Sequence, residues 1–148
     1  MKKHLFFLIL LLSGMAGAQV VNIPDPAFKN YLLTSTAIGA AGTPILINTN
    51  GDNEIQVSEA LAVRELEIDN EEIESMAGIE SFTNLRVLDI QWALELTTLD
   101  ITALSELEEL YLGWMDNLDN IYCSGLANLN KSYRRMKPIF MGWIVPGS

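Results

Sequence analysis

The chain has 148 residues, with 9 basic and 19 acidic side chains and a formal net charge of -10 at pH 7. Excess negative charge repels nucleic-acid phosphates and anionic lipid surfaces, so we expect no nucleic-acid partner and no docking on a charged membrane. The single cysteine excludes an internal disulfide. The single histidine, His4, lies in a segment that we expect to be removed, which excludes histidine-based catalysis from the remainder.

Residues 1–18 have the pattern of a secretory signal peptide. Residues 2–4 are basic, residues 5–12 are apolar, and residues 16–18 read Ala-Gly-Ala, a small-residue cleavage site. The apolar stretch is too short to span a bilayer. We therefore expect a secreted protein, extracellular or at the cell surface, with the periplasm as another destination and no membrane insertion after cleavage.

Residues 19–60 are expected to form an N-terminal cap. Asp25 followed by Pro26 is a typical start of a helix, because aspartate accepts hydrogen bonds from the first turn and proline lacks an N–H there. Phe28, Tyr31 and Leu32 then share one helical face. Such a helix would cover the open apolar end of a repeat domain.

An asparagine-rich loop follows a short predicted strand at 45–47. Oxygen-bearing residues stand at positions 1, 3, 5, 7, 9 and 12 of the segment 48–59, which is the spacing of a calcium-binding loop. The segment resembles an EF-hand or dockerin-type loop, with Asn53 at the sixth position, where glycine is usual. The implied ligands are Asn48, Asn50, Asp52, the Glu54 backbone carbonyl, Gln56 through a water molecule, and Glu59.

Only two of these ligands carry charge, so we expect a structural Ca2+ ion with a dissociation constant on the order of 10⁻⁴ to 10⁻³ M. The ion would fix the junction between the cap and the first repeat. A polar turn that needs no ion is the alternative interpretation.

Residues 57–130 contain an internal repeat. An L-x-x-L-x-I motif recurs every 11 residues, and Trp92 and Trp114 recur at twice that spacing, which indicates a 22-residue unit with two similar halves. An amphipathic helix also satisfies some of these spacings, but recurrence over four cycles favours a solenoid. Cys123 occupies a predicted inward position, where a buried apolar role is expected. The first column of the motif is Leu85, Leu96, Leu107, Leu118 and Leu129.

This repeat resembles that of leucine-rich repeat proteins, specifically the secreted kind common in Bacteroidota, and residues 23–33 are similar to the N-terminal segment of the same proteins. The resemblance implies an α/β repeat solenoid with coils of about 22 residues, short parallel strands and a small helical N-terminal cap. It also implies longer relatives with more repeats and a C-terminal sorting domain.

Outward residues of the strands would gather on one face of the sheet. Glu67, Asp89 and Tyr111 recur 22 residues apart, and Trp92 and Trp114 form an adjoining column. Aromatic rings beside acids suit recognition of a protein or a glycan, whereas tryptophans stacked at a coil corner would be structural. We predict a non-enzymatic module that binds a protein or cell-surface ligand. The alternative is a carbohydrate-binding or carbohydrate-processing surface protein.

Residues 131–148 differ in composition from the rest, with four basic residues and no acid. Ser132 and Arg134 stand where the leucine columns predict apolar residues. Either the apolar residues between 139 and 145 form a C-terminal cap, or the chain is a truncated fragment of a longer repeat protein.

Overall fold

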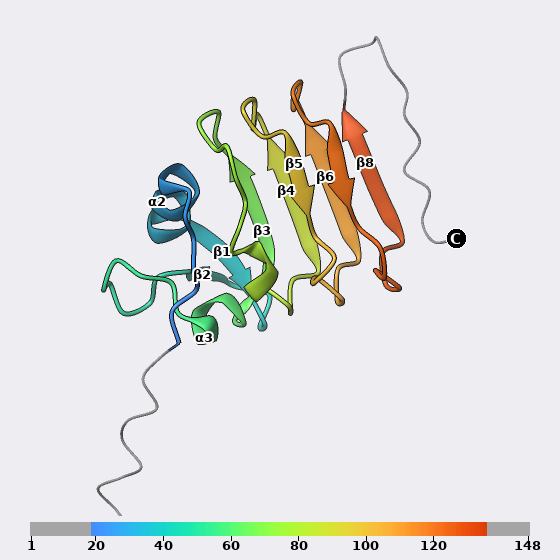
Figure 1. Ribbon diagram of the computed structural model, residues 1–148. Coiled ribbons are helices and arrows are strands. Elements are labelled where there is room, and N and C mark those ends of the chain that lie inside the picture. Colours follow the sequence, from blue (N-terminus) through green and yellow to red (C-terminus); the bar gives the residue numbers. More distant parts are fainter. Residues whose placement is uncertain (1–18, 136–148) are drawn as a thin grey trace, which may run out of the picture.

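A computed structural model describes residues 19–135, so the predicted signal peptide and the tail beyond residue 135 lie outside the described residues. The described chain forms a β-solenoid of about three coils of about 22 residues, preceded by a cap of mixed structure (Figure 1). No helix in the described range is long and apolar enough to cross a membrane.

The cap begins with the predicted helix. Asp25 is its N-cap and Pro26 is its first residue, while Phe28 and Leu32 are fully buried in the core. The Tyr31 hydroxyl donates to the Glu67 carbonyl (3.1 Å) and accepts from the Asp69 N–H (3.3 Å), which joins the helix to the edge of the first solenoid strand. The elements of the cap are α2 (Pro26–Thr34), β1 (Thr36–Gly39), β2 (Pro44–Leu46) and α3 (Val57–Ala60).

Two sheets form the walls of the solenoid. The larger sheet has six strands in the order β2-β1-β3-β4-β6-β8, and the smaller sheet pairs β5 with β7. From β3 onward every pairing is parallel, and each residue lies opposite the residue 22 positions later, as in Leu66–Leu88–Leu110. The 22-residue unit is therefore confirmed. The solenoid strands are β3 (Val63–Asp69), β4 (Val87–Gln91), β5 (Thr98–Asp100), β6 (Glu109–Gly113), β7 (Asn120–Tyr122) and β8 (Lys131–Arg135).

The two halves of each unit supply strands to opposite walls. Leu88 of β4 and Leu99 of β5 both point into the core and are fully buried. The predicted α/β repeat solenoid is confirmed as a repeat solenoid, but its coils are not of the α/β kind. The described coils contain one 3-10 turn, Ile79–Ser81, and no α-helix. In the second and third coils each 11-residue half holds a strand of three to five residues and its turns, which leaves too little chain for a crossover helix.

The C-terminal coil keeps its backbone register although its side-chain pattern changes. Ser132 pairs with Leu110 in the β6–β8 ladder, so the register extends five residues beyond residue 130, where the leucine pattern ends. Backbone hydrogen bonds form this ladder and do not depend on apolar side chains. Burial decreases here, since Cys123 is half-buried whereas Ile101, one unit earlier, is fully buried.

Asparagine side chains tie successive coils together. Asn84, Asn117 and Asn128 each donate from Nδ2 to the backbone carbonyl 23 residues earlier, at 2.8, 2.8 and 3.0 Å. All three stand directly before a leucine of the repeat, and the other two residues in this column, Glu95 and Glu106, are exposed acids. An ionised glutamate has no proton to donate, so the ties are present only where the column holds asparagine.

Asn117→Ala is expected to lower the free energy of unfolding by about 1 kcal/mol, because the Leu94 carbonyl loses its partner. The melting temperature should fall by about 2–4 °C in a domain of this size. Glu106→Ala is the matched control, since it removes an exposed side chain from the same column without removing a tie. Equal effects of the two substitutions would contradict a stabilising role of the asparagine hydrogen bonds between coils.

Candidate functional sites

The predicted ligand residues lie together on the outer face of the six-stranded sheet. Glu67, Asp89 and Tyr111 are direct neighbours in register on β3, β4 and β6. We call the outward side chains of these three strands the acidic face. Its acidic members are Glu65, Glu67, Asp69, Asp89 and Glu109.

The acidic face is hollowed beside the β1–β2 hairpin. The hollow has a volume of about 300 Å³. Thr36, Ile38 and Pro44 of the hairpin form one wall, because the antiparallel pairing of β1 with β3 places Ile38 opposite Glu65. The other walls come from the solenoid. They are formed by Glu65, Glu67, Val87, Asp89 and Tyr111.

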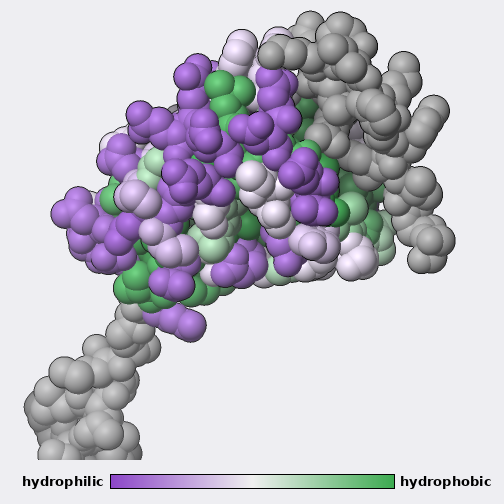
Figure 2. Space-filling model, turned by 45° about the horizontal axis from the view of Figure 1, so that its top comes forward, coloured by the Kyte–Doolittle hydropathy of each residue, from purple (hydrophilic) through white to green (hydrophobic). Residues whose placement is uncertain are grey.

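Negative charge on the acidic face is only locally compensated. Glu109 accepts from Lys131 Nζ (2.5 Å) and from the Tyr111 hydroxyl (2.5 Å), and these contacts, with Lys131 the larger, hold the pKa of Glu109 below its ordinary value. None of the residues that line the hollow is basic. Figure 2 shows many hydrophilic side chains on the described surface, with less polar ones among them. The face therefore suits a cationic partner.

Trp92 and Trp114 stack on each other at the coil corner. Their ring centroids are 4.7 Å apart and their planes differ by 1°. Each follows the last residue of a strand, and each has a positive φ, 59° and 49°. That backbone conformation is costly for a bulky residue, and stacking offsets part of the cost. Trp92 keeps 39% of its surface exposed.

The 48–59 loop gathers most of the predicted calcium ligands into one hydrogen-bond network. Asp52 Oδ2 accepts from Asn50 Nδ2 (3.0 Å) and from Gln56 Nε2 (2.8 Å). Asn48 stands apart, accepting from the Gly51 N–H, and the Glu54 side chain turns away to pair with Lys29 at 2.7 Å. The strand before the loop is Pro44–Leu46, so no helix enters it.

Glu59 closes the loop at its last position. Only 6% of its surface is exposed. Its Oε1 accepts from the N–H and the hydroxyl of Thr49, both at 2.7 Å, and its Oε2 accepts from the Gln56 N–H at 3.0 Å. Burial raises the pKa of Glu59, but these hydrogen bonds outweigh burial and the net pKa is lowered. The carboxylate is thus ionised and points into the loop.

The loop fits a hard cation in its donor chemistry and only partly in its geometry. All six predicted residues offer oxygen, and Asn53 has the left-handed backbone (φ 62°) that the sixth position requires. However, the amide nitrogens of Asn50 and Gln56 face Asp52, where a cation would require oxygens. In the described part of the chain, no three His, Cys, Asp or Glu side chains are grouped so that they could hold a metal ion.

Asp25 has a second role that sequence reasoning missed. Its Oδ1 caps α2 by accepting from the Phe28 N–H (2.9 Å), while its Oδ2 accepts from the N–H groups of Glu74 (2.9 Å) and Ser75 (2.8 Å). Burial raises the pKa of Asp25, but these hydrogen bonds outweigh burial, so the net pKa lies below its ordinary value. The contact spans about 50 residues of sequence, and no local signal announces it.

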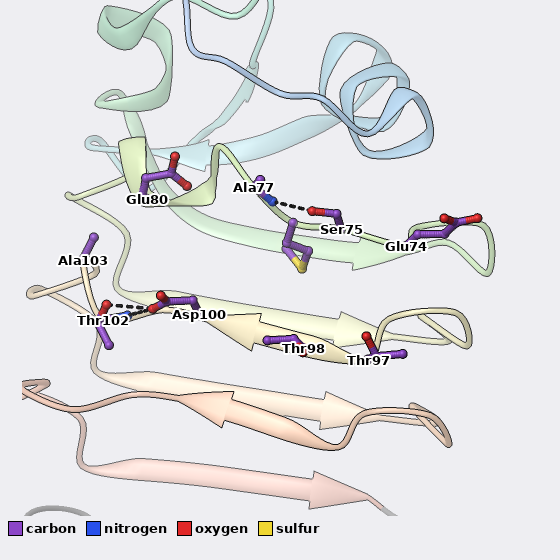
Figure 3. A pocket seen from close by; sticks show the side chains of 10 residues that line it. Glu74, Ser75, Ala77, Glu80, Thr97, Thr98, Asp100, Thr102 and Ala103 are labelled. Carbon is purple, nitrogen blue, oxygen red and sulfur yellow. Dashed lines mark hydrogen bonds between the residues drawn. The ribbon is translucent and has the colours of Figure 1, made fainter.

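A second groove lies on the other wall of the solenoid, between residues 74–80 and strand β5 (Figure 3). Its volume is about 380 Å³. Glu74, Glu80 and Asp100 supply acidic groups to it, and three threonines line the β5 side. We call it the β5 groove. The alternating leucine pattern could not reveal it, because it arises where a strand of the repeat is missing.

Comparison of the chain with protein families, with curated proteins and with solved structures found no match. Function must therefore be argued from the surfaces described above.

Asp25→Asn is expected to destabilise the protein at pH 7 by about 1–3 kcal/mol, since an amide offers one acceptor oxygen where the carboxylate offers two. A lowered folded pKa stabilises the protein above the unfolded pKa of about 3.9 and ceases to do so as pH falls through the folded value. The variant should lose less stability than wild type between about pH 5 and pH 3. Urea unfolding at several pH values measures both effects.

The control is Glu106→Gln, which neutralises an exposed acid without removing a described contact. If Asp25→Asn and Glu106→Gln respond alike to acid, the Asp25 carboxylate does not join the cap to the first coil.

Proposed function

We propose that this protein is an exported, non-catalytic binding module whose acidic face recognises a basic protein or cell-surface ligand. The hollow of about 300 Å³ on that face carries the proposal. Three successive coils and the hairpin build it together, so it depends on the folded solenoid. The L-x-x-L-x-I motif further supports a leucine-rich repeat protein as the class of this solenoid.

The chemistry of the hollow favours a protein ligand over a glycan. Glu67 and Asp89 stand side by side in register, which suits lysine or arginine side chains of a partner. Tyr111 adds an aromatic ring with little rotamer entropy to lose. In contrast, Trp92 and Trp114 each cover one ring face of the other. Glycan binding through the exposed part of Trp92 is therefore the second candidate.

We also propose that Ca2+ stabilises the 48–59 loop without taking part in ligand binding. Support comes from the left-handed Asn53 and from two carboxylates that enter the same network, Asp52 and Glu59. The pKa of Asp52 is lowered, first by the Gln56 side chain and then by the Glu54 N–H, so it is ionised at neutral pH. Binding would require the Asn50 and Gln56 amides to present oxygen in place of nitrogen.

Selection of random 12-residue peptides against the full-length mature protein is expected to enrich sequences rich in lysine and arginine. The double variant Glu67→Lys/Asp89→Lys should weaken the selected peptides by at least about tenfold, because two attractive contacts become repulsive. Fluorescence anisotropy at physiological salt measures the affinities.

The matched control is Glu95→Lys/Asp119→Lys, which makes the same change of net charge in the turns that lead to β5 and β7. Equal weakening by both double variants would indicate general electrostatics and contradict a site on the acidic face. A glycan array with wild type and Trp92→Ala tests the second candidate. Glycan binding by wild type that is lost in Trp92→Ala would favour it.

Millimolar calcium is expected to raise the melting temperature above that in chelator by roughly 3 to 6 °C, because an ion that binds only the folded loop stabilises it. Asp52→Ala should remove this difference. Asp100→Ala is the control, since Asp100 is another exposed aspartate that accepts hydrogen bonds from a residue close in sequence, Thr102, but lies outside the loop. Identical melting curves of wild type with and without calcium would rule out the ion.

A further inference from the structure

The β5 groove exists because one strand of the smaller sheet is missing from the first coil. The residues one unit before β5 are 76–78, and in a regular repeat they would pair with it. Asp25 instead binds the N–H groups of Glu74 and Ser75. Gly78 packs so closely on Ile23 and the Asn22 carbonyl that a Cβ atom there would lie 2.7 and 3.0 Å from them. The cap thus holds this segment in a non-strand conformation.

The edge of β5 that faces the groove has backbone groups available. Thr97 accepts from Asn120 on β7, and Ile101 donates to Tyr122 on the same strand. Peptide groups of a parallel ladder alternate in direction, so those of Thr98 and Asp100 point to the opposite edge. No strand within residues 19–135 pairs with that edge. An open edge of this kind is a template for an added strand.

The lining of the groove specifies the kind of strand that fits. The apolar residues of the lining are Met76, which is 4% exposed, and the alanines 77 and 103. Glu74, Glu80 and Asp100 supply acidic groups, and none of the ten lining residues is basic. Alternate side chains of an extended peptide point to opposite sides. A peptide with small apolar and basic residues in alternation therefore matches both surfaces.

We propose that the β5 groove binds an extended basic peptide, which adds to β5 as a third strand of the smaller sheet. Hydrogen bonds from Thr98 and Asp100 supply affinity, and the acidic residues select lysine or arginine. This site lies on the opposite wall from the acidic face and is independent of it.

The experiment uses full-length mature protein and a labelled peptide of sequence KVKVKVK, measured by fluorescence anisotropy at physiological salt. Binding is expected, with no binding of EVEVEVE. N-methylation of alternate peptide nitrogens removes strand pairing and keeps the charge, so it should weaken binding by at least about tenfold. Thr98→Pro should have a similar effect, because proline has no N–H and is tolerated where that N–H faces away from the ladder.

Two further variants separate this site from the acidic face. Glu74→Lys should weaken KVKVKVK more strongly than Glu67→Lys/Asp89→Lys does, although the double variant changes the net charge twice as much. Undiminished binding of the N-methylated peptide, or a loss of binding confined to Glu67→Lys/Asp89→Lys, would overturn the proposal. The N-methylated peptide gives this answer on wild type even if Thr98→Pro does not fold. Self-association abolished by Thr98→Pro would assign the edge to a second copy of the chain and would also overturn it.

Discussion

The carboxylate of Asp25 is the constraint on which the N-terminal half of the structure depends. One oxygen starts helix α2 and the other holds the backbone of residues 74 and 75, so a single buried charge fixes the cap against the first coil. A carboxylate suits this task because it accepts several N–H groups at once. Glu59 has the same role in the neighbouring loop, where its carboxylate accepts hydrogen bonds from the N–H groups of Thr49 and Gln56. Loops without regular structure are thereby kept in place by acids.

This mode of attachment makes the two walls of the solenoid different. On the larger sheet, the hairpin and β3 extend the ladder to six strands, and the acidic face is continuous. On the smaller sheet, attachment of residues 74 and 75 to Asp25 removes the strand that would pair with β5, and a groove remains. A regular repeat sequence therefore produces one continuous sheet face, hollowed beside the hairpin, and one interrupted face. Two distinct surface geometries follow from one fold.

The sequence was most informative where it repeats. The 11-residue leucine motif, with Trp92 and Trp114 recurring at twice its spacing, predicted the 22-residue unit and the inward side chains. It also predicted which outward side chains are neighbours, because strand pairing converts a sequence period into spatial adjacency. The signal for the start of α2, Asp25 followed by Pro26, lies within two residues of sequence, so this start was also predictable. Contacts of Asp25 with residues 74 and 75 were not, since they join segments that share no period. The helical content of the coils was overestimated because the resemblance, rather than the 11-residue length of each half, set that expectation.

The uneven use of acidic residues explains why the net charge of -10 bears on function. Asp25 is buried and already accepts three N–H groups, so it needs no external partner. The acids of the acidic face and of the β5 groove are different, because most lie on the surface with few basic neighbours. Grouping like charges on a sheet destabilises the fold by self-repulsion. A positively charged ligand would relieve that repulsion, so the same residues that weaken the free protein would strengthen its complex.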